Sequence, residues 1–238
     1  MTLDPTVITD NWLLFARGLG LTVQISAVAI VIGALIAVAF TAAALSPWRV
    51  LRWLMAVISL LLRGIPFIVL VFLIHFGLPS MGMRLPPLLS GTVALSLFAA
   101  AYFAEMLRGV LASLPKGQWE SGRVVGFSAF QILRYIIVPQ ILRPSVPPAV
   151  NIAIMVVKES SVISAITVGE LTYQGLVVQG NTFAPFEVFF AVAILYWATT
   201  FALSQLGGWA ERELLRSHGG DARPGGIAQK YLSLERVK

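Results

Sequence analysis

The sequence predicts an all-α integral membrane protein with about five transmembrane helices, its N-terminus outside and its C-terminus inside. Three observations lead to this fold class. Hydrophobic residues make up 58% of the 238 residues and charged residues only 12%, which is about half the charge of an ordinary soluble domain. Long apolar stretches recur along the chain, and about 20 apolar residues suffice for a helix to cross a bilayer. The basic residues gather in alternate connecting segments, as they do in multi-pass proteins.

Three of the spans are marked by nearly uninterrupted apolar sequence. No charge occurs between Arg17 and Arg49, which predicts a span over residues 20–44. A second apolar segment, in the middle of the chain, predicts a span over 88–106. A further charge-free stretch predicts the last span over 187–210.

The second span contains a helix-breaking motif. Residues 52–78 are strongly apolar but include the run Arg63-Gly64-Ile65-Pro66. Because proline lacks the backbone donor that a helix interior needs, we expect one span that is locally broken at Gly64–Pro66.

The fourth span is the least regular. Only residues 144–157 separate Arg143 from Lys158, too few to cross the hydrocarbon core. Either this segment is re-entrant, or Lys158 and Glu159 lie inside the membrane. We favour a span over 145–168 that contains this pair.

The basic residues set the orientation and the domain limits. With the N-terminus outside, the outer side keeps Arg17 and Arg84, while Arg63 and Lys158 are left at membrane depth. The thirteen remaining basic residues then lie inside, as the positive-inside rule favours: Arg49, Arg52, Arg108, Lys116, Arg123, Arg134, Arg143, Arg212, Arg216, Arg223, Lys230, Arg236 and Lys238. The chain divides into an extracytoplasmic segment 1–19, a transmembrane domain 20–214 and a cytoplasmic tail 215–238.

The composition excludes several kinds of chemistry. The chain has no cysteine, which excludes disulfides, thiolate metal ligands and cysteine nucleophiles. Its two histidines, His75 and His218, are too far apart in sequence to suggest a metal site. The sequence contains no GxxxxGK[ST], GxSxG or HExxH pattern, which argues against nucleotide binding by a phosphate loop and against hydrolase chemistry. The net charge of +6 is attributed to basic residues on one membrane face rather than to nucleic-acid binding.

The segment 113–139, on the predicted inner side, has the signals of a folded docking loop. A proline starts a short helix over 115–124, and Gly126 suits its C-terminal end. Ser128 and Gln131 form a capping box that starts a second helix. The loop carries more apolar residues than a solvated connector needs, and these predict a surface for a soluble partner: Trp119, Val124, Val125, Phe127, Phe130 and Leu133.

The same loop resembles the EAA loop of ABC importer permeases, whose pattern is Glu-Ala-Ala, three residues, Gly, nine residues and Ile-x-Leu-Pro. Here Glu120-Ser121-Gly122 is followed after three residues by Gly126, and Ile136-Ile137-Val138-Pro139 follows after nine more. The departures from the pattern, at positions 121, 122 and 138, keep the residues small or apolar. We expect Pro139 to interrupt the second helix at the membrane.

Further motifs, in the expected order, resemble the polar amino-acid branch of this family. The resemblance covers roughly residues 15–214. It rests on Arg63-Gly64-Ile65-Pro66, the run AYFAEMLRG over 101–109, the run LPKGQ over 114–118, Pro139-Gln140, Pro147-Pro148, Asn151, Lys158-Glu159-Ser160-Ser161 and Gly169-Glu170-Leu171.

The resemblance implies a non-catalytic transport subunit in the bacterial inner membrane. Two permease subunits, identical or different, form the pathway among membrane lipids, and an extracytoplasmic binding protein delivers a polar amino acid or an analogue. A separate ATPase binds ATP and Mg, so this chain is expected to hold no cofactor. The ATPase is expected to dock on loop residues that match the family motifs: Gly117, Glu120, Ser121, Gly122, Gly126 and Pro139.

Five charged residues are candidates for the substrate pathway, and each has a structural alternative. Arg63 either binds a carboxylate bidentately or caps the broken helix. Glu105 either acts in gating or pairs with the basic residue three positions on. Lys158 and Glu159, about 100° apart on a helix, either line the pathway or join an interfacial ion-pair network. Glu170 is a similar case near the outer mouth.

Two other function classes stay open on the sequence alone. An ion-coupled carrier or channel accounts for charges at membrane depth, but it gives the docking loop no purpose. A membrane enzyme lacks the nucleophile and metal motifs named above. Transport that persists without an ATPase partner would identify the carrier or channel.

Overall fold

The computed structural model describes residues 4–216, and this part of the chain contains helices and connecting turns but no strand. The helices are α1 (Thr6–Asp10), α2 (Trp12–Ala44), α3 (Arg49–Gly64), α4 (Phe67–Phe72), the π-helical η1 (Leu73–Gly77), the 3₁₀ turn η2 (Leu78–Met81), α5 (Pro87–Ala112), α6 (Gly117–Val124), α7 (Ala129–Gln131), the π-helical η3 (Ile132–Ile137), α8 (Val138–Glu159), the 3₁₀ turn η4 (Ser160–Ile166), α9 (Leu171–Thr182) and α10 (Pro185–Arg216). The tail predicted over 215–238 lies almost entirely outside the described residues.

The prediction of about five spans is confirmed when a bent helix pair is counted as one span. Within residues 4–216, four helical segments are long and apolar enough to cross a membrane: Trp12–Ala44, Pro87–Ala112, Ala129–Ile166 and Pro185–Glu213. The fifth candidate is the pair Arg49–Gly64 and Phe67–Met81. Every one of the five contains most of its predicted interval, and the helices extend further at one or both ends.

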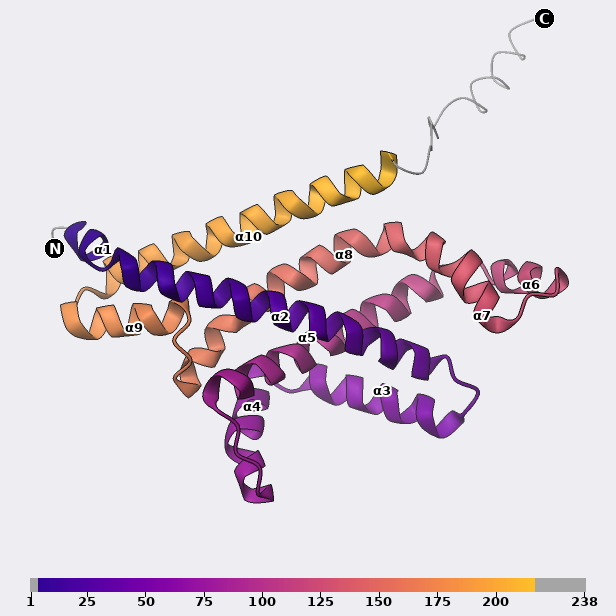
Figure 1. Ribbon diagram of the computed structural model, residues 1–238, viewed down its shortest axis with the longest axis horizontal. Helices are drawn as coiled ribbons and strands as arrows, with labels where there is room; N and C mark the ends of the chain where they lie inside the picture. Colours follow the sequence, from indigo (N-terminus) through magenta and orange to yellow (C-terminus); the bar gives the residue numbers. More distant parts are fainter. Residues whose placement is uncertain (1–3, 217–238) are drawn as a thin grey trace, which may run out of the picture.

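The second span differs from the expected rod with a local break. Its two halves meet at an angle of 109°, and Figure 1 shows α4 pointing away from the long helices while α3 runs beside α2 and α5. The break falls where the motif predicted it, because Ile65 and Pro66 both have extended ψ angles, of 146° and 139°. Proline restricts its preceding residue to such extended conformations. The helix therefore ends here and the chain changes direction sharply, instead of continuing as one slightly bent helix.

The fourth span continues through Pro139, so the expected interruption at this residue is wrong. Helix α7 passes into the π-helical turn η3 and then into α8 without a gap. Pro139 comes just after the π-helical turn, and a local π-helical adjustment lets a membrane helix accommodate the donor that a proline lacks. Lys158 lies in the last turn of this helix and Glu159 at its end, so the segment is a long helix rather than a re-entrant loop.

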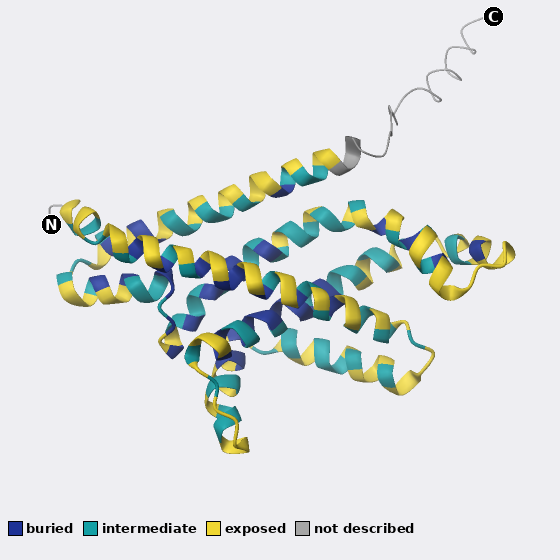
Figure 2. Cartoon of the chain, viewed as in Figure 1, coloured by how far each residue is buried: buried dark blue, intermediate teal, exposed yellow. Residues whose placement is uncertain are grey.

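The core forms where the long helices α2, α5 and α8 approach closely, and Figure 2 shows the buried residues concentrated there. Small residues permit this approach, as is common between helices in membranes. A Cβ atom added at Gly33 of α2 would lie 2.6 Å from the Cβ of Ala99 on α5. A Cβ atom at Gly207 of α10 would overlap Val150 of α8.

Large apolar side chains cover the outer faces of the bundle. Val31 and Leu35 on α2 and Trp197 and Leu206 on α10 are all more than half exposed. In water such a surface would be unfavourable, whereas lipid or a partner subunit accommodates it. Exposed apolar surface outside and close packing of small residues inside together describe a membrane domain.

Candidate docking loop and charged pathway residues

The docking loop is folded as its sequence signals predicted. Helix α6 ends in a Schellman arrangement: the amide of Phe127 donates to the carbonyl of Gly122 at 3.0 Å, and the amide of Gly126 donates to the carbonyl of Arg123 at 3.0 Å. Gly126 has φ +83°, a conformation that residues with a Cβ rarely adopt. The predicted turn at this glycine is therefore confirmed.

The second helix of the loop begins at the predicted capping box. The amide of Gln131 donates to Ser128 Oγ at 3.3 Å, and the amide of Ser128 donates to Gln131 Oε1 at 2.8 Å. A further hydrogen bond of 3.1 Å joins Gln140 Nε2 on α8 to Gln118 Oε1 on α6. The loop is thereby held to the fourth span as one unit.

The loop residues that match the family motif occupy different environments. Gly122 is buried, and a Cβ atom there would lie 2.7 Å from Ile132 Cγ1, so the close packing of α6 on η3 explains a glycine in place of alanine. Glu120 and Ser121 are exposed on α6, Gly117 begins the helix, and Pro139 is exposed on α8. The motif thus combines one packed residue with several accessible ones.

The apolar residues of the loop divide into two groups. Val124, Val125 and Phe130 are between 72% and 88% exposed, and they form an exposed apolar surface together with Phe127 and Tyr135. Trp119 and Leu133 instead pack against the small core of Ile132, Ile137 and Ile141. Two of the six residues predicted for docking therefore hold the loop on the membrane domain.

Two of the predicted pathway residues are brought together by the fold. Arg63 Nη2 lies 3.1 Å from Glu105 Oε2, which joins the end of α3 to α5. Arg108 forms the i,i+3 pair that was one of the two alternatives for Glu105: its Nε donates to Glu105 Oε2 at 3.1 Å and its Nη2 donates to Glu105 Oε1. Arg63 Nε also donates to the Ser59 carbonyl at 3.4 Å. One carboxylate is therefore shared by two guanidinium groups.

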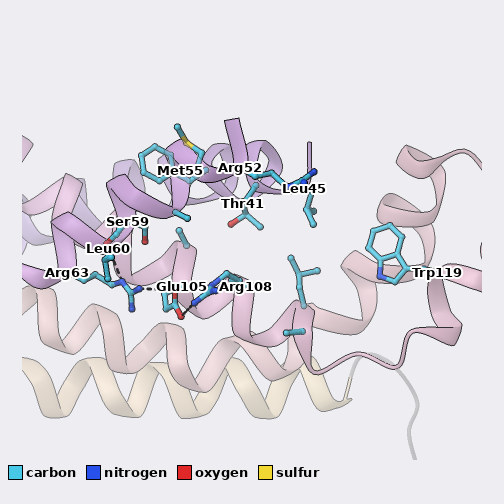
Figure 3. A pocket seen from close by; sticks show the side chains of 16 residues that line it. Thr41, Leu45, Arg52, Met55, Ser59, Leu60, Arg63, Glu105, Arg108 and Trp119 are labelled. Atoms are coloured by element: carbon cyan, nitrogen blue, oxygen red, sulfur yellow. Dashed lines mark hydrogen bonds and ion pairs between the residues drawn. The ribbon is translucent and has the colours of Figure 1, made fainter. Parts of the chain in front are cut away.

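A cavity of about 540 Å³ adjoins this cluster, between α2, α3 and α5. Figure 3 shows Arg63, Glu105 and Arg108 joined along one side, with Arg52 across from them and Trp119 of α6 near the far end. The cavity therefore extends from the charged cluster to the docking loop. Its other lining residues are Phe40, Thr41, Ala44, Leu45, Met55, Ala56, Ser59, Leu60, Ala104, Leu111 and Ala112.

Lys158 and Glu159 lie apart from this cavity and are not among its lining residues. Lys158 is exposed and Glu159 is half-buried at the end of α8. Neither belongs to an ion pair within residues 4–216. The structure therefore does not bring the five charged candidates into one site.

Glu170 is fully buried and joins three helices. Its carboxylate accepts hydrogen bonds from the Tyr173 amide at 2.8 Å, from the Tyr196 hydroxyl at 2.6 Å and from Thr22 Oγ1 at 3.4 Å. Thr22 Oγ1 in turn accepts the amide of Leu171 at 3.1 Å. Glu170 is thus the N-cap of α9 and connects it to α2 and α10.

No sequence motif indicates the two side chains that bind this carboxylate. Thr22 and Tyr196 lie within apolar spans and belong to no motif. Only their distance from Glu170 in the folded chain distinguishes them from other span residues. His75, by contrast, forms the hydrogen bond that a histidine in an apolar span requires, with Nδ1 at 3.1 Å from Ser90 Oγ.

Comparison with known proteins places this chain in a family. The model of the binding-protein-dependent transport system inner membrane component matches residues 29–216. The chain belongs to this family. The family assignment favours a transport subunit over the carrier, channel and enzyme classes that the sequence left open.

Individual members of the family are similar over most of their length. The chain is 34% identical over 182 residues to the probable amino-acid ABC transporter permease protein YckA of Bacillus subtilis, covering 76% of this chain and 80% of the relative. It is 31% identical over 216 residues to the probable glutamine ABC transporter permease protein GlnM of the same organism, covering 91% of this chain and 100% of the relative. A solved structure described as an amino acid ABC transporter with histidines matches with a TM-score of 0.84 and 30% identity, covering 90% of this chain and 100% of that chain.

Proposed function

We propose that this chain is the permease subunit of an ATP-driven ABC importer of polar amino acids or their analogues. The observation that carries the proposal is the docking loop: α6 and α7, joined at Gly126, are folded onto the membrane domain and present an exposed apolar surface. A carrier or channel has no use for such a surface. A separate ATPase subunit is the partner that it fits.

We infer that the energy-supplying chemistry resides on that partner. ATP and Mg bind to the ATPase, and the permease transmits the resulting movement through its loop. A second permease subunit completes the pathway and covers part of the apolar outer surface of the bundle. An extracytoplasmic binding protein supplies the amino acid.

For the pathway we propose Lys158 and Glu159 as the residues that contact the cargo. An amino acid carries a carboxylate and an ammonium group, and these two side chains carry the complementary charges without an ion pair of their own within residues 4–216. Arg63 and Glu105 are paired with each other, which supports structural roles for both. The hydrogen bonds of Glu170 support a structural role for it as well.

The decisive experiment is co-expression of the permease with an ATPase encoded beside it, followed by co-purification and by ATP hydrolysis in proteoliposomes. We expect the two chains to purify together and hydrolysis to rise when the loaded binding protein is added. Val124→Asp with Phe130→Asp should abolish co-purification, because both charges fall on the apolar docking surface. Ser113→Asp, in the same loop region but outside that surface, is the control. Full assembly and coupled uptake in the double variant would refute the docking proposal.

A further inference from the structure

The cavity between α2, α3 and α5 has an excess of positive charge. Arg52, Arg63 and Arg108 line it, and Glu105 is the one carboxylate among the lining residues. Both oxygens of that carboxylate accept hydrogen bonds from Arg63 or Arg108. The cluster therefore keeps a net positive charge and complements an anion.

Arg52 is placed to contribute directly to anion binding. Its Nη1 donates to the carbonyls of Ser46 and Pro47, at 2.9 and 3.2 Å. These bonds hold the guanidinium at the N-terminal end of α3. Within the described chain, its Nε and Nη2 have no hydrogen-bond acceptor. These donors and the remaining donors of Arg108 both line the cavity, and guanidinium donors of this kind bind anionic groups.

The rest of the cavity wall is mainly apolar. Phe40, Leu45, Met55, Leu60 and Leu111 contribute to it, and Leu45 and Leu60 are about half exposed or more, at 48% and 64%. A ligand that satisfies both parts of the wall has an anionic head and a long apolar portion. Basic pockets between transmembrane helices on the cytoplasmic side bind the headgroups of anionic lipids.

A free amino acid fits this cavity less well. Its ammonium group needs an acceptor, and the one carboxylate available among the lining residues is already shared by two arginines. Its size also leaves much of the 540 Å³ unfilled. The charge balance and the apolar wall therefore both favour a lipid.

We propose that this cavity binds an anionic phospholipid of the inner leaflet, with the phosphate between Arg52 and Arg108 and an acyl chain along the apolar wall. The placement in the inner leaflet rests on the proposed function, which puts the α6 end of the bundle at the cytoplasmic face. Because Trp119 of α6 also lines the cavity, the bound lipid contacts the docking loop and stabilises its position on the membrane domain.

The test is fluorescence quenching by a lipid with brominated acyl chains. The full-length permease is reconstituted into phosphatidylcholine vesicles and titrated with brominated phosphatidylglycerol. Subtracting the signal of Trp119→Phe from that of the unchanged protein isolates the quenching of Trp119 from that of the other five tryptophans among the six. We expect half-maximal quenching at a far lower fraction of phosphatidylglycerol than of brominated phosphatidylcholine.

The variants identify the site. Arg52→Gln should weaken the quenching by phosphatidylglycerol about fivefold, and Arg108→Gln by about the same factor, because each removes one basic group near the headgroup. Arg52→Lys should retain most of the binding, since it keeps the charge. The matched control is Arg49→Gln with Arg123→Gln, which removes two charges near the same end of the bundle but none from the cavity.

Three results would overturn the proposal. An equal loss in the control variant would show a general attraction to the basic face, and equal quenching by phosphatidylcholine would show no selection of the headgroup. Displacement of the brominated lipid by millimolar free amino acid would assign the cavity to the cargo. If the proposed function is wrong, the result is different: the permease does not purify with the ATPase, but the lipid titration is unchanged.

Discussion

At the scale of single residues, the buried carboxylate of Glu170 stabilises the end of the bundle near α9. It is itself fully buried, and it accepts hydrogen bonds from the Tyr173 amide and the Tyr196 hydroxyl, which are partly buried. A buried donor left without an acceptor costs about 1–3 kcal/mol. The carboxylate therefore connects α9 and α10 more firmly than its single charge suggests.

The first prediction concerns this network. Glu170→Ala should lower the free energy of unfolding by about 2–4 kcal/mol, because two partly buried donors lose their acceptor. Glu170→Gln should lose less than half as much, since its amide oxygen can still accept from the Tyr173 amide and its NH2 group can donate to the Tyr196 hydroxyl. Thermal unfolding of the detergent-solubilised variants, monitored by tryptophan fluorescence, measures the difference in their stability. Glu120→Ala, at an exposed position, is the control, and an equal loss in the Gln and Ala variants would contradict the proposed network.

Gly126 shows how one backbone conformation sets the geometry of the docking loop. A Cβ atom at this position meets nothing within 4 Å, but the residue has φ +83°. Any effect of a substitution is therefore conformational rather than steric. The left-handed conformation costs a residue with a Cβ about 1–2 kcal/mol.

The second prediction follows from that cost. Gly126→Ala should weaken association with the ATPase by about tenfold, because about 1–2 kcal/mol is needed to restore the turn on docking. The stability of the membrane domain should change little. Gly109→Ala is the matched control, since its Cβ also meets nothing within 4 Å and its φ is ordinary. Surface plasmon resonance with the purified subunits measures the affinity of each variant for the ATPase. Unchanged affinity in Gly126→Ala would exclude a role for the turn in docking.

At the scale of helices, the approach of α2 to α5 depends on a small residue at one position. A Cβ atom at Gly33 would lie 2.6 Å from Ala99 Cβ and 3.0 Å from the backbone of Ser96 and Ala100. Backbone atoms cannot move aside as a flexible side chain can. The two helices must separate if a larger residue stands there.

The third prediction compares two glycines of α2. Gly33→Val should destabilise the protein by about 1–3 kcal/mol, the usual cost of overpacking a core. Gly20→Val should have little effect on packing, because a Cβ atom at Gly20 meets nothing within 4 Å. Thermal unfolding and the yield of monodisperse protein report both changes. Equal tolerance of valine at the two positions would show that α2 and α5 do not pack as described.

The ionic cluster of α3 and α5 is a second link between elements, and it can be measured as a coupling energy. Arg63 and Glu105 are 27% and 34% exposed, so their interaction is only partly screened by solvent. The fourth prediction is that Arg63→Gln and Glu105→Gln together cost less stability than the sum of the two single changes, with a coupling energy of about 1 kcal/mol. A coupling energy near zero would mean that the pair does not join the helix break to α5.

At the scale of the whole molecule, the arrangement of the long helices places the docking loop and the N-terminal helix at opposite ends, as Figure 1 shows. The chain has no cysteine, so single introduced cysteines report the orientation without further engineering. Val125 on the docking loop is exposed, and so is Met83 in the connection between η2 and α5, which is predicted to lie on the same side of the membrane as the N-terminus.

The fifth prediction is the orientation itself. A membrane-impermeant maleimide added to intact cells should label Met83→Cys but not Val125→Cys, because the loop with Val125 carries several basic residues and these favour the inner side. Permeabilised cells should show labelling of both. The reverse pattern in intact cells would place the N-terminus inside and would exclude ATPase docking at α6.

The sequence by itself determined the number of spans, the two helices of the docking loop and the glycine between them. These features depend on local chemistry: apolar length, a capping box and a conformation that favours glycine. It also located the break at Gly64–Pro66, because proline acts on its immediate neighbours.

Only the tertiary structure decided the consequences of these local features. In the folded chain the break is a bend of 109°, and the helix continues through Pro139. Arg63 is paired with Glu105, so neither side chain is left free for the pathway. It also buried Glu170 against Thr22 and Tyr196. The physical reason is that helix direction and ion pairing depend on groups from other helices, and a sequence shows which residues need partners but not which partners packing brings near.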